Sequence, residues 1–138
     1  MKDKETRDNI RMVEDLFAAF GRGDEQGLLT LAAEDIEWIT PGEDWPLAGT
    51  RRGHPGLLDL IQKSTEKLET SFPEAPEFVG QGNRVLVIGF STGRVKATNK
   101  KFEDHFVIAI TVQNGKVTNV REYVDTQAMA RASEKPQV

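Results

Sequence analysis

The 138-residue chain contains no cysteine. This absence excludes a disulfide framework, a thiolate nucleophile and a cysteine-ligated metal site, and it is typical of proteins in a reducing compartment. No apolar run approaches the roughly 20 residues that a membrane-spanning helix needs. Residues 1–5 also lack the apolar stretch of a signal peptide. We therefore expect a cytoplasmic protein that has no membrane partner.

The chain also lacks a long basic run. Its net charge is −4 and its isoelectric point is about 5.3, which argues against binding to a nucleic-acid backbone. The two histidines, His54 and His105, stand far apart and outside any HExxH run, so no metal site is indicated. The stretch Gly80-Gln81-Gly82 lacks the third glycine and the following helix of a dinucleotide site. We therefore expect no metal and no cofactor.

What the chain does have is the composition of a globular protein, with 38% hydrophobic and 29% charged residues. Its length suits a single domain over residues 1–138, with a core at about residues 7–130 and loose ends at 1–5 and 133–138. Apolar side chains recur at helical spacing from Ile10 to Phe20, and a glycine-rich stop follows.

The rest of the chain alternates between helical and extended patterns. Further helices are expected after Asp24 and from Pro55, and strands at 36–40, 77–79 and 85–90. Residues 41–53 are typical of a loop. This order predicts an α+β domain in which the helices pack on one face of a curved antiparallel sheet.

Two β-rich runs meet at Asn114-Gly115, which is a strong signal for a hairpin because both turn residues need a positive φ. A two-residue turn predicts these pairs: Val112 with Val117, Ile108 with Arg121, Val107 with Glu122, and His105 with Val124. Side chains alternate along each strand, so the hairpin has two faces. One face carries large apolar residues: Phe102, Phe106, Ile108, Ile110, Val112 and Tyr123. The other face is smaller and partly charged: Glu103, His105, Val107, Ala109, Val120, Glu122 and Val124.

Several segments together resemble the SnoaL-like group of the nuclear transport factor 2-like (ketosteroid isomerase-like) superfamily. They are residues 13–20 followed by Gly23-Asp24, then 37–41, 48–53, 105–106, 114–117 and 121–125. The resemblance implies a cone, in which a bent sheet wraps a long N-terminal helix and leaves an apolar pocket open at one end. It implies no single reaction, because members include isomerases, polyketide cyclases, epoxide hydrolases, dehydratases and binding proteins without chemistry.

The same resemblance argues against steroid isomerase chemistry. The catalytic positions of those isomerases fall on Leu16, Thr40 and Val107, whereas the reaction needs a tyrosine and two carboxyl groups. The position of Glu122 is similar to one that carries an aspartate in cyclases and epoxide hydrolases of the superfamily. The resemblance therefore implies that Glu122 is the main catalytic candidate. The epoxide hydrolase arginine has no clear match, and Arg51-Arg52 is expected to be a solvated pair.

The resemblance also places the face that carries His105 and Glu122 inside the pocket. The two side chains would then be diagonal neighbours that handle protons together. The alternative, which periodicity alone favours, is that the helices cover the Phe106 face and that His105 and Glu122 lie in water. For the pocket arrangement, the expected ligand-binding residues are Trp38, Thr40, Trp45, Glu103, Val107, Val120 and Val124.

Three functions fit this pattern. The first is a cofactor-free enzyme that performs acid–base chemistry on a small apolar molecule, with Glu122 and His105 as the catalytic pair. The second is a non-catalytic carrier or sensor that uses the same pocket. The third is an interaction module that binds a protein with its outer sheet face. Under the first two, a homodimer is expected to cover the outer face, which would then expose Phe106, Ile108, Ile110 and Tyr123.

Overall fold

The computed structural model describes residues 2–135. Its elements follow in the order α1 (Lys2–Arg22), α2 (Glu25–Leu31), β1 (Ala32–Thr40), β2 (Gly49–Arg52), α3 (Gly53–Lys67), β3 (Leu68–Ser71), β4 (Glu77–Gln81), β5 (Arg84–Val95), β6 (Lys100–Gln113), β7 (Lys116–Tyr123) and α4 (Thr126–Ser133). No helix in this part of the chain is both long and apolar enough to cross a membrane.

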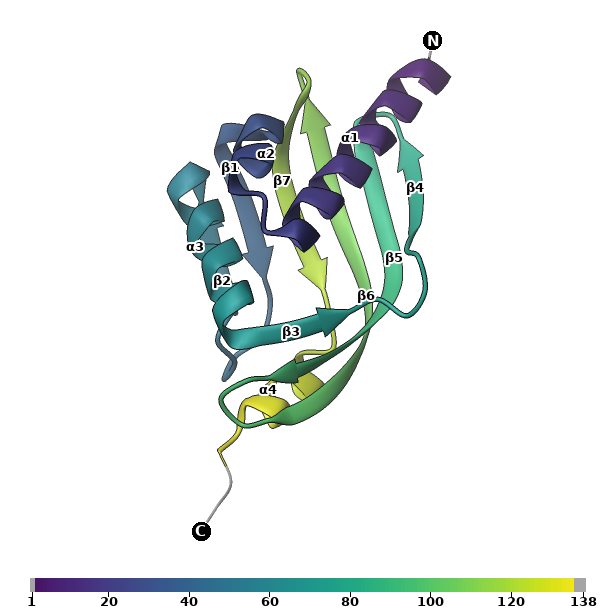
Figure 1. The fold of residues 1–138 in the computed structure, drawn as a ribbon. Helices are drawn as coiled ribbons and strands as arrows, with labels where there is room; N and C mark the ends of the chain where they lie inside the picture. The colour runs from purple at the N-terminus through teal and green to yellow at the C-terminus, as the bar shows by residue number, and fades with distance from the viewer. Residues whose placement is uncertain (1, 136–138) are drawn as a thin grey trace.

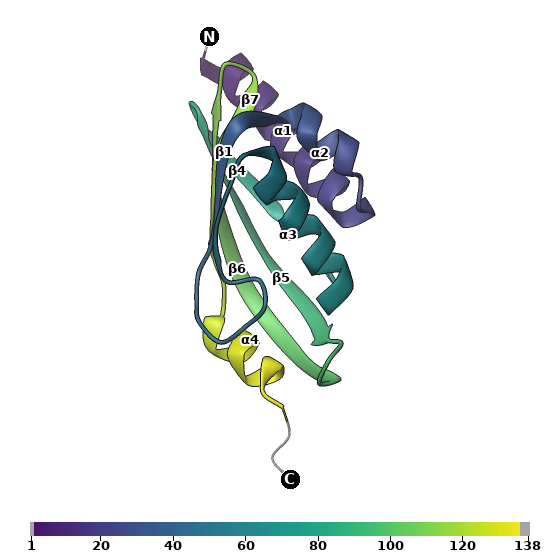
Figure 2. The ribbon, with the colours of Figure 1, turned by 90° about the vertical axis from the view of Figure 1, so that its left-hand side faces the viewer.

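The strands form one sheet in the order β2-β1-β7-β6-β5-β3, and β4 also pairs with β5. Its pairs are antiparallel apart from β1 and β7, which run parallel, so the sheet is mixed rather than purely antiparallel. Helices α1, α2 and α3 lie on one side of this bent sheet, and α4 lies at its lower end (Figures 1 and 2). The expected α+β cone is confirmed.

The strand β5 gives the sheet its bend. Its first half pairs with β4 and its second half pairs with β3, which crosses in front of the lower sheet in Figure 1. The short strands β2 and β3 flank α3 on either side, and neither was expected from the sequence. Each has only four residues, which is too few for an alternation of apolar and polar residues to be recognised in the sequence.

The N-terminal helix buries one stripe of small and large apolar residues, among them Val13, Leu16 and Ala19. Gly23 ends it with a φ of 68°, in the left-handed region that glycine adopts without strain. The expectation of a loose N-terminus is wrong for residues 2–5, which form the first turn of α1. Residue 1 and residues 136–138, also expected to be loose, lie outside the described residues.

The hairpin of β6 and β7 has the predicted turn but a different register. Asn114 and Gly115 both have positive φ, and Val112 pairs with Val117 as predicted. Beyond that pair an extra residue in β7, Thr118, forms a bulge, so that Thr111 pairs with Asn119. The remaining predicted pairs are therefore wrong: Ile108 pairs with Glu122, Val107 with Tyr123 and Ala109 with Arg121.

The bulge changes which side chains of β6 and β7 share a face of the sheet. The large residues of β6, such as Phe106 and Ile110, now share the concave side with Glu122 and are buried beneath the helices. His105 lies on the convex side instead. The dimer surface expected from Phe106, Ile108 and Ile110 is therefore wrong, although Tyr123 remains exposed.

Candidate functional site

A cavity of about 160 Å³ lies inside the cone, between the sheet and the helices α1 and α3. A cavity of this order can hold a benzene-sized molecule. Most of its wall is aromatic or aliphatic, and the aromatic residues are Phe17, Phe20, Trp38, Trp45, Phe72, Phe102 and Phe106. Its polar residues are Ser64, Thr70, Ser91, Asp104 and Glu122, and no lysine, arginine or histidine of the described chain lines it.

Glu122 enters the cavity from β7 and is held from β1. The parallel pairing of these strands puts Trp38 next to Val120 and so brings β1 side chains beside Glu122. Trp38 Nε1 donates a hydrogen bond to Glu122 Oε2 at 2.6 Å, and Thr40 Oγ1 donates to the same oxygen at 3.1 Å. One oxygen of the carboxyl group is therefore fixed by two donors.

The second oxygen, Glu122 Oε1, receives no hydrogen bond from residues 2–135. No fully buried side-chain oxygen or nitrogen in this part of the chain lacks a partner. It follows that Oε1 is not sealed in the protein and is open to the cavity that Glu122 lines. A carboxyl group in this arrangement can give or take a proton at its free oxygen.

The surroundings of Glu122 raise its pKa above the ordinary value of 4.5. Burial is the largest cause, because it disfavours the charged form. The hydrogen bonds from Trp38 and Thr40 act in the opposite direction, the charge of Asp104 adds to the rise, and Arg51 opposes it. Glu122 therefore keeps its proton to a higher pH than a solvated glutamate does, as a general acid or base near neutral pH requires.

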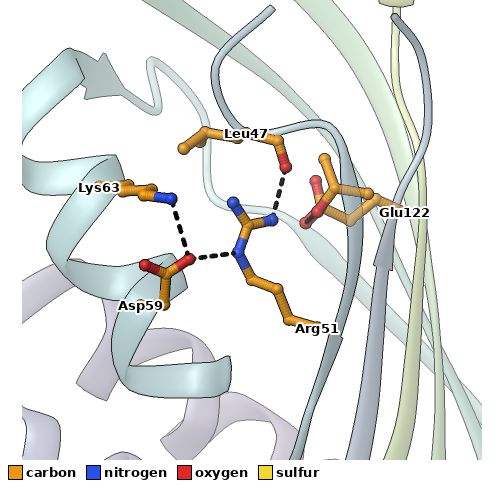
Figure 3. A network of polar contacts seen from close by, with 6 residues as sticks. Leu47, Arg51, Asp59, Lys63 and Glu122 are labelled. Carbon is orange, nitrogen blue, oxygen red and sulfur yellow. Dashed lines mark hydrogen bonds and ion pairs between the residues drawn. The ribbon is translucent and has the colours of Figure 1, made fainter. Parts of the chain in front are cut away.

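Arg51 lies beside Glu122 and is held by its own set of contacts (Figure 3). Its Nε donates to Asp59 Oδ2 at 3.1 Å and its Nη1 donates to the carbonyl oxygen of Leu47 at 2.6 Å. Lys63 also pairs with Asp59, at 3.3 Å. The Arg51 side chain is only 10% exposed, so the expectation that it is solvated is wrong. It is a fixed positive charge near Glu122.

Asp104 is a second carboxyl group in the cavity, and the sequence analysis missed it. Only 4% of the residue is exposed, and its Oδ1 accepts a hydrogen bond from the backbone N–H of Asp125 at 2.8 Å. Burial raises its pKa, and that hydrogen bond opposes the rise. A signal was available, because Asp104 is a charged residue between Phe102 and Phe106 on the large apolar face of its strand.

The structure separates the predicted site residues into two groups. Trp38, Trp45 and Val124 line the cavity, Thr40 holds Glu122, and Val120 is buried in the core on the same face. The other group lies on the convex side of the sheet and does not line the cavity.

His105, Glu103 and Val107 make up that second group, and their predicted place in the pocket is wrong. His105 is exposed and packs against Phe90, with ring centroids 4.6 Å apart. The predicted contact between His105 and Glu122 does not form. The cause is the bulge, which moves the odd-numbered side chains of β6 to the face opposite Glu122.

Comparisons with known proteins agree with this architecture. The model of the SnoaL-like domain family matches residues 13–120. A crystal structure of an NTF2-like protein from Burkholderia xenovorans LB400 is 63% identical, with a TM-score of 0.90, over 94% of this chain and 98% of that one.

Two more distant proteins are similar over most of their length. TerC, whose structure was determined after co-crystallization with polyporic acid, is 29% identical with a TM-score of 0.77, over 93% of this chain and 99% of that one. An uncharacterized protein of Mycobacterium tuberculosis H37Rv is 27% identical over 115 residues, which are 83% of this chain and 87% of that protein.

Proposed function

Because this chain belongs to the SnoaL-like family, we propose that its cavity binds a small, mostly apolar molecule and that Glu122 transfers a proton on it without a cofactor. The observation that carries this proposal is the arrangement of Glu122, with Oε2 held by Trp38 and Thr40 and Oε1 open to an otherwise apolar cavity. The co-crystallization of TerC with polyporic acid supports the idea that this fold accepts a small organic molecule.

The contacts of Glu122 suit a group that changes its protonation state. When Glu122 is charged, the Trp38 and Thr40 donors stabilise the negative charge on Oε2 and leave Oε1 free to take a proton from the substrate. When it is protonated, Oε1 can return that proton to another atom of the same molecule. The fixed charge of Arg51 favours the charged state, so the environment supports both forms.

The apolar wall also contributes to this chemistry. Aromatic and aliphatic side chains exclude water from the bound molecule, and electrostatic interactions are stronger where water is excluded. The reaction would be an isomerisation, a cyclisation, a dehydration, or a hydrolysis in which one water molecule enters with the substrate. Each of these needs proton transfer without a redox partner. His105 takes no part in this scheme, because it lies on the other face of the sheet.

A carrier or sensor without chemistry is the second candidate. It is favoured by the two hydrogen bonds to Glu122, which would also satisfy a carboxyl group that serves only to orient a ligand. The interaction module is the least supported candidate, because it predicts an interior filled by side chains rather than a cavity.

One variant separates the two main candidates. Glu122→Gln keeps the shape and most of the hydrogen bonding but cannot take up a proton. We expect a panel of small aromatic molecules to change the tryptophan fluorescence of both proteins, since Trp38 and Trp45 line the cavity. For a panel member that the wild type converts, turnover by Glu122→Gln should fall by roughly 10²–10⁴-fold with little change in affinity.

The matched control is Glu103→Gln, which removes the same charge from the convex face of the neighbouring strand. Its turnover and affinity should equal those of the wild type. If molecules bind and none is converted, the carrier function holds and catalysis does not. If no panel member binds, the whole proposal fails.

A further inference from the structure

The cavity wall has carboxyl groups whose negative charge, when they are ionised, no cationic side chain of the wall balances. Two carboxyl groups, Asp104 and Glu122, line the cavity, and no cationic side chain of the described residues does. Arg51, whose charge acts on Glu122, is already bonded to Asp59 and to the carbonyl oxygen of Leu47. A neutral ligand would leave this imbalance in place, and an anionic ligand would increase it.

Ser91 provides a second and independent observation at the Asp104 end of the cavity. It lies directly across from Asp104 in the pairing of β5 with β6. Only 4% of Ser91 is exposed, and it lines the cavity. Its hydroxyl group makes no hydrogen bond within residues 2–135, and no fully buried side-chain oxygen in these residues lacks a partner, so the Ser91 hydroxyl is open to the cavity that the residue lines.

One carboxyl oxygen of Asp104 also has no hydrogen-bond partner among the described residues. Its Oδ1 accepts the N–H of Asp125 at the start of α4, whereas Oδ2 receives no hydrogen bond from the described chain. Asp104 Oδ2 and Ser91 Oγ are thus two oxygen acceptors on adjacent strands, facing the same space. Glu122 differs from them, because two donors already hold one of its oxygens.

We propose that Asp104 and Ser91 anchor a positively charged nitrogen, so that the ligand of this cavity is a small aromatic or alicyclic amine. This inference rests on the proposed function, because it takes the cavity to be a ligand site. A protonated amine offers several N–H donors and no acceptor, which matches the two free oxygens. Its apolar body would fill the aromatic part of the cavity and extend towards Glu122 Oε1.

The cavity wall supports the same ligand class. A cation is attracted to the faces of aromatic rings, and seven aromatic residues line the cavity. A charge-assisted hydrogen bond is stronger than a neutral one, and it gains further where water is excluded. The volume of about 160 Å³ limits the ligand to about the size of one ring with a short substituent. Asp104 would therefore position the substrate, and Glu122 would act on it.

Three probes of nearly equal size test this inference at pH 7 by titration calorimetry. Benzylammonium carries a positive charge, ethylbenzene has a methyl group in place of the ammonium, and phenylacetate carries a negative charge. We expect benzylammonium to bind about tenfold or more tightly than ethylbenzene, in keeping with a hydrogen bond to a charged group. Phenylacetate should bind more weakly than either.

Two variants test whether Asp104 and Ser91 cause the preference for benzylammonium. Asp104→Asn keeps a carbonyl oxygen for the Asp125 N–H and should lose about tenfold in affinity for benzylammonium, with ethylbenzene unchanged. Ser91→Ala should lose affinity for benzylammonium by a smaller factor, and it keeps the test decisive if Asp104→Asn does not fold. Glu103→Gln, on the convex face of the same strand, should leave all three affinities unchanged.

The outcomes separate the two proposals. If ethylbenzene binds as tightly as benzylammonium, or if both anchor variants keep the preference for the cation, the amine anchor is overturned and the apolar ligand site stands. If none of the three probes binds, the ligand site itself fails, and the anchor fails with it.

Discussion

Glu122 experiences two opposing influences. The Trp38 and Thr40 donors favour its charged form, whereas burial and the nearby Asp104 favour the protonated form, and burial dominates. A group in this position costs folding free energy when it is charged, because charge is disfavoured where water is excluded. A buried side chain whose charged form destabilises the folded protein is expected where function requires it.

This conflict predicts a pH dependence of stability. The pKa of Glu122 is higher in the folded protein than its ordinary value of 4.5, so the folded protein binds the proton more tightly. The stabilisation from protonation is fully present below pH 4.5 and is lost as pH rises towards the folded pKa. Relative to Glu122→Gln, the wild type should therefore become less stable as pH rises from about 4 to 8.

Urea unfolding of both proteins across this range measures the difference directly. Of the charged groups near Glu122, Asp104 on β6 also has a raised pKa, and its charge adds to the rise in the pKa of Glu122. The change of this stability difference with pH therefore reflects Asp104 and Glu122 together. Asp104→Asn should make that change smaller. A stability difference that stays constant with pH, or grows in favour of the wild type, would contradict the assignment.

Among the strands and loops, the β6–β7 hairpin shows what a sequence can and cannot predict. Alternation correctly sorted the residues of each strand into two faces, because it depends on the local backbone alone. The relative phase of the two strands depends on the bulge at Thr118, which no turn signal in the sequence indicates. Glu122 was found despite this error, but His105 was placed on the wrong face and Asp104 was missed.

Gly93 on β5 stands at a close approach to β3 and to the Phe102 ring. A Cβ atom at Gly93 would lie 2.7 Å from the backbone oxygen of Glu69 and would also clash with the Phe102 ring. Gly93→Ala should therefore lower the free energy of unfolding by about 1–3 kcal/mol. The control is Gly21→Ala, where nothing lies within 4 Å and the helix should gain up to about 1 kcal/mol. Equal effects of the two changes in urea unfolding would refute this packing role.

The loop between β1 and β2 should report ligand binding through Trp45. Trp45 lines the cavity, and its only side-chain hydrogen bond among the described residues stays within its own loop, to the carbonyl oxygen of Pro41 at 3.0 Å. Trp38, by contrast, is pinned on a strand by Glu122 and stacks on Phe20. A ligand should therefore change the surroundings of Trp45 more, since loops move more readily than strands.

Trp45→Phe should accordingly remove most of the ligand-induced change in fluorescence, and Trp38→Phe should remove less. Benzylammonium and ethylbenzene serve as probes at concentrations where calorimetry shows binding to the wild type. If the fluorescence of Trp45→Phe changes on ligand binding as much as that of the wild type, Trp45 does not report binding and the loop is only a static part of the cavity wall.

On the scale of the whole molecule, the cone leaves an apolar strip on the convex face of its sheet. Val79, Ile88 and Tyr123 are 43%, 38% and 54% exposed, and the strand pairing places all three on this face. The sequence predicted the cone and a covered outer face, but it named the wrong residues for that cover. The reason is again the bulge, which sends Phe106 and Ile110 into the interior.

We propose that a second copy of the chain covers this strip in a homodimer. Arg121 lies on the β7 side of the strip and Glu77 on the β4 side, so a twofold axis through the strip would bring opposite charges together. Closed twofold pairing is the simplest way for one surface to cover itself, and exposed apolar patches of this kind commonly mark interfaces.

Sedimentation of the wild type at micromolar concentration should therefore give twice the chain mass of 15.4 kDa. Ile88→Glu places a charge in the middle of the strip and should yield a monomer with unchanged affinity for the cavity probes, because Ile88 points away from the cavity. Gln62→Glu adds the same charge on the exposed side of α3 and should remain a dimer. A monomeric wild type, or equal dissociation by both variants, would show that the convex face is not the dimer interface.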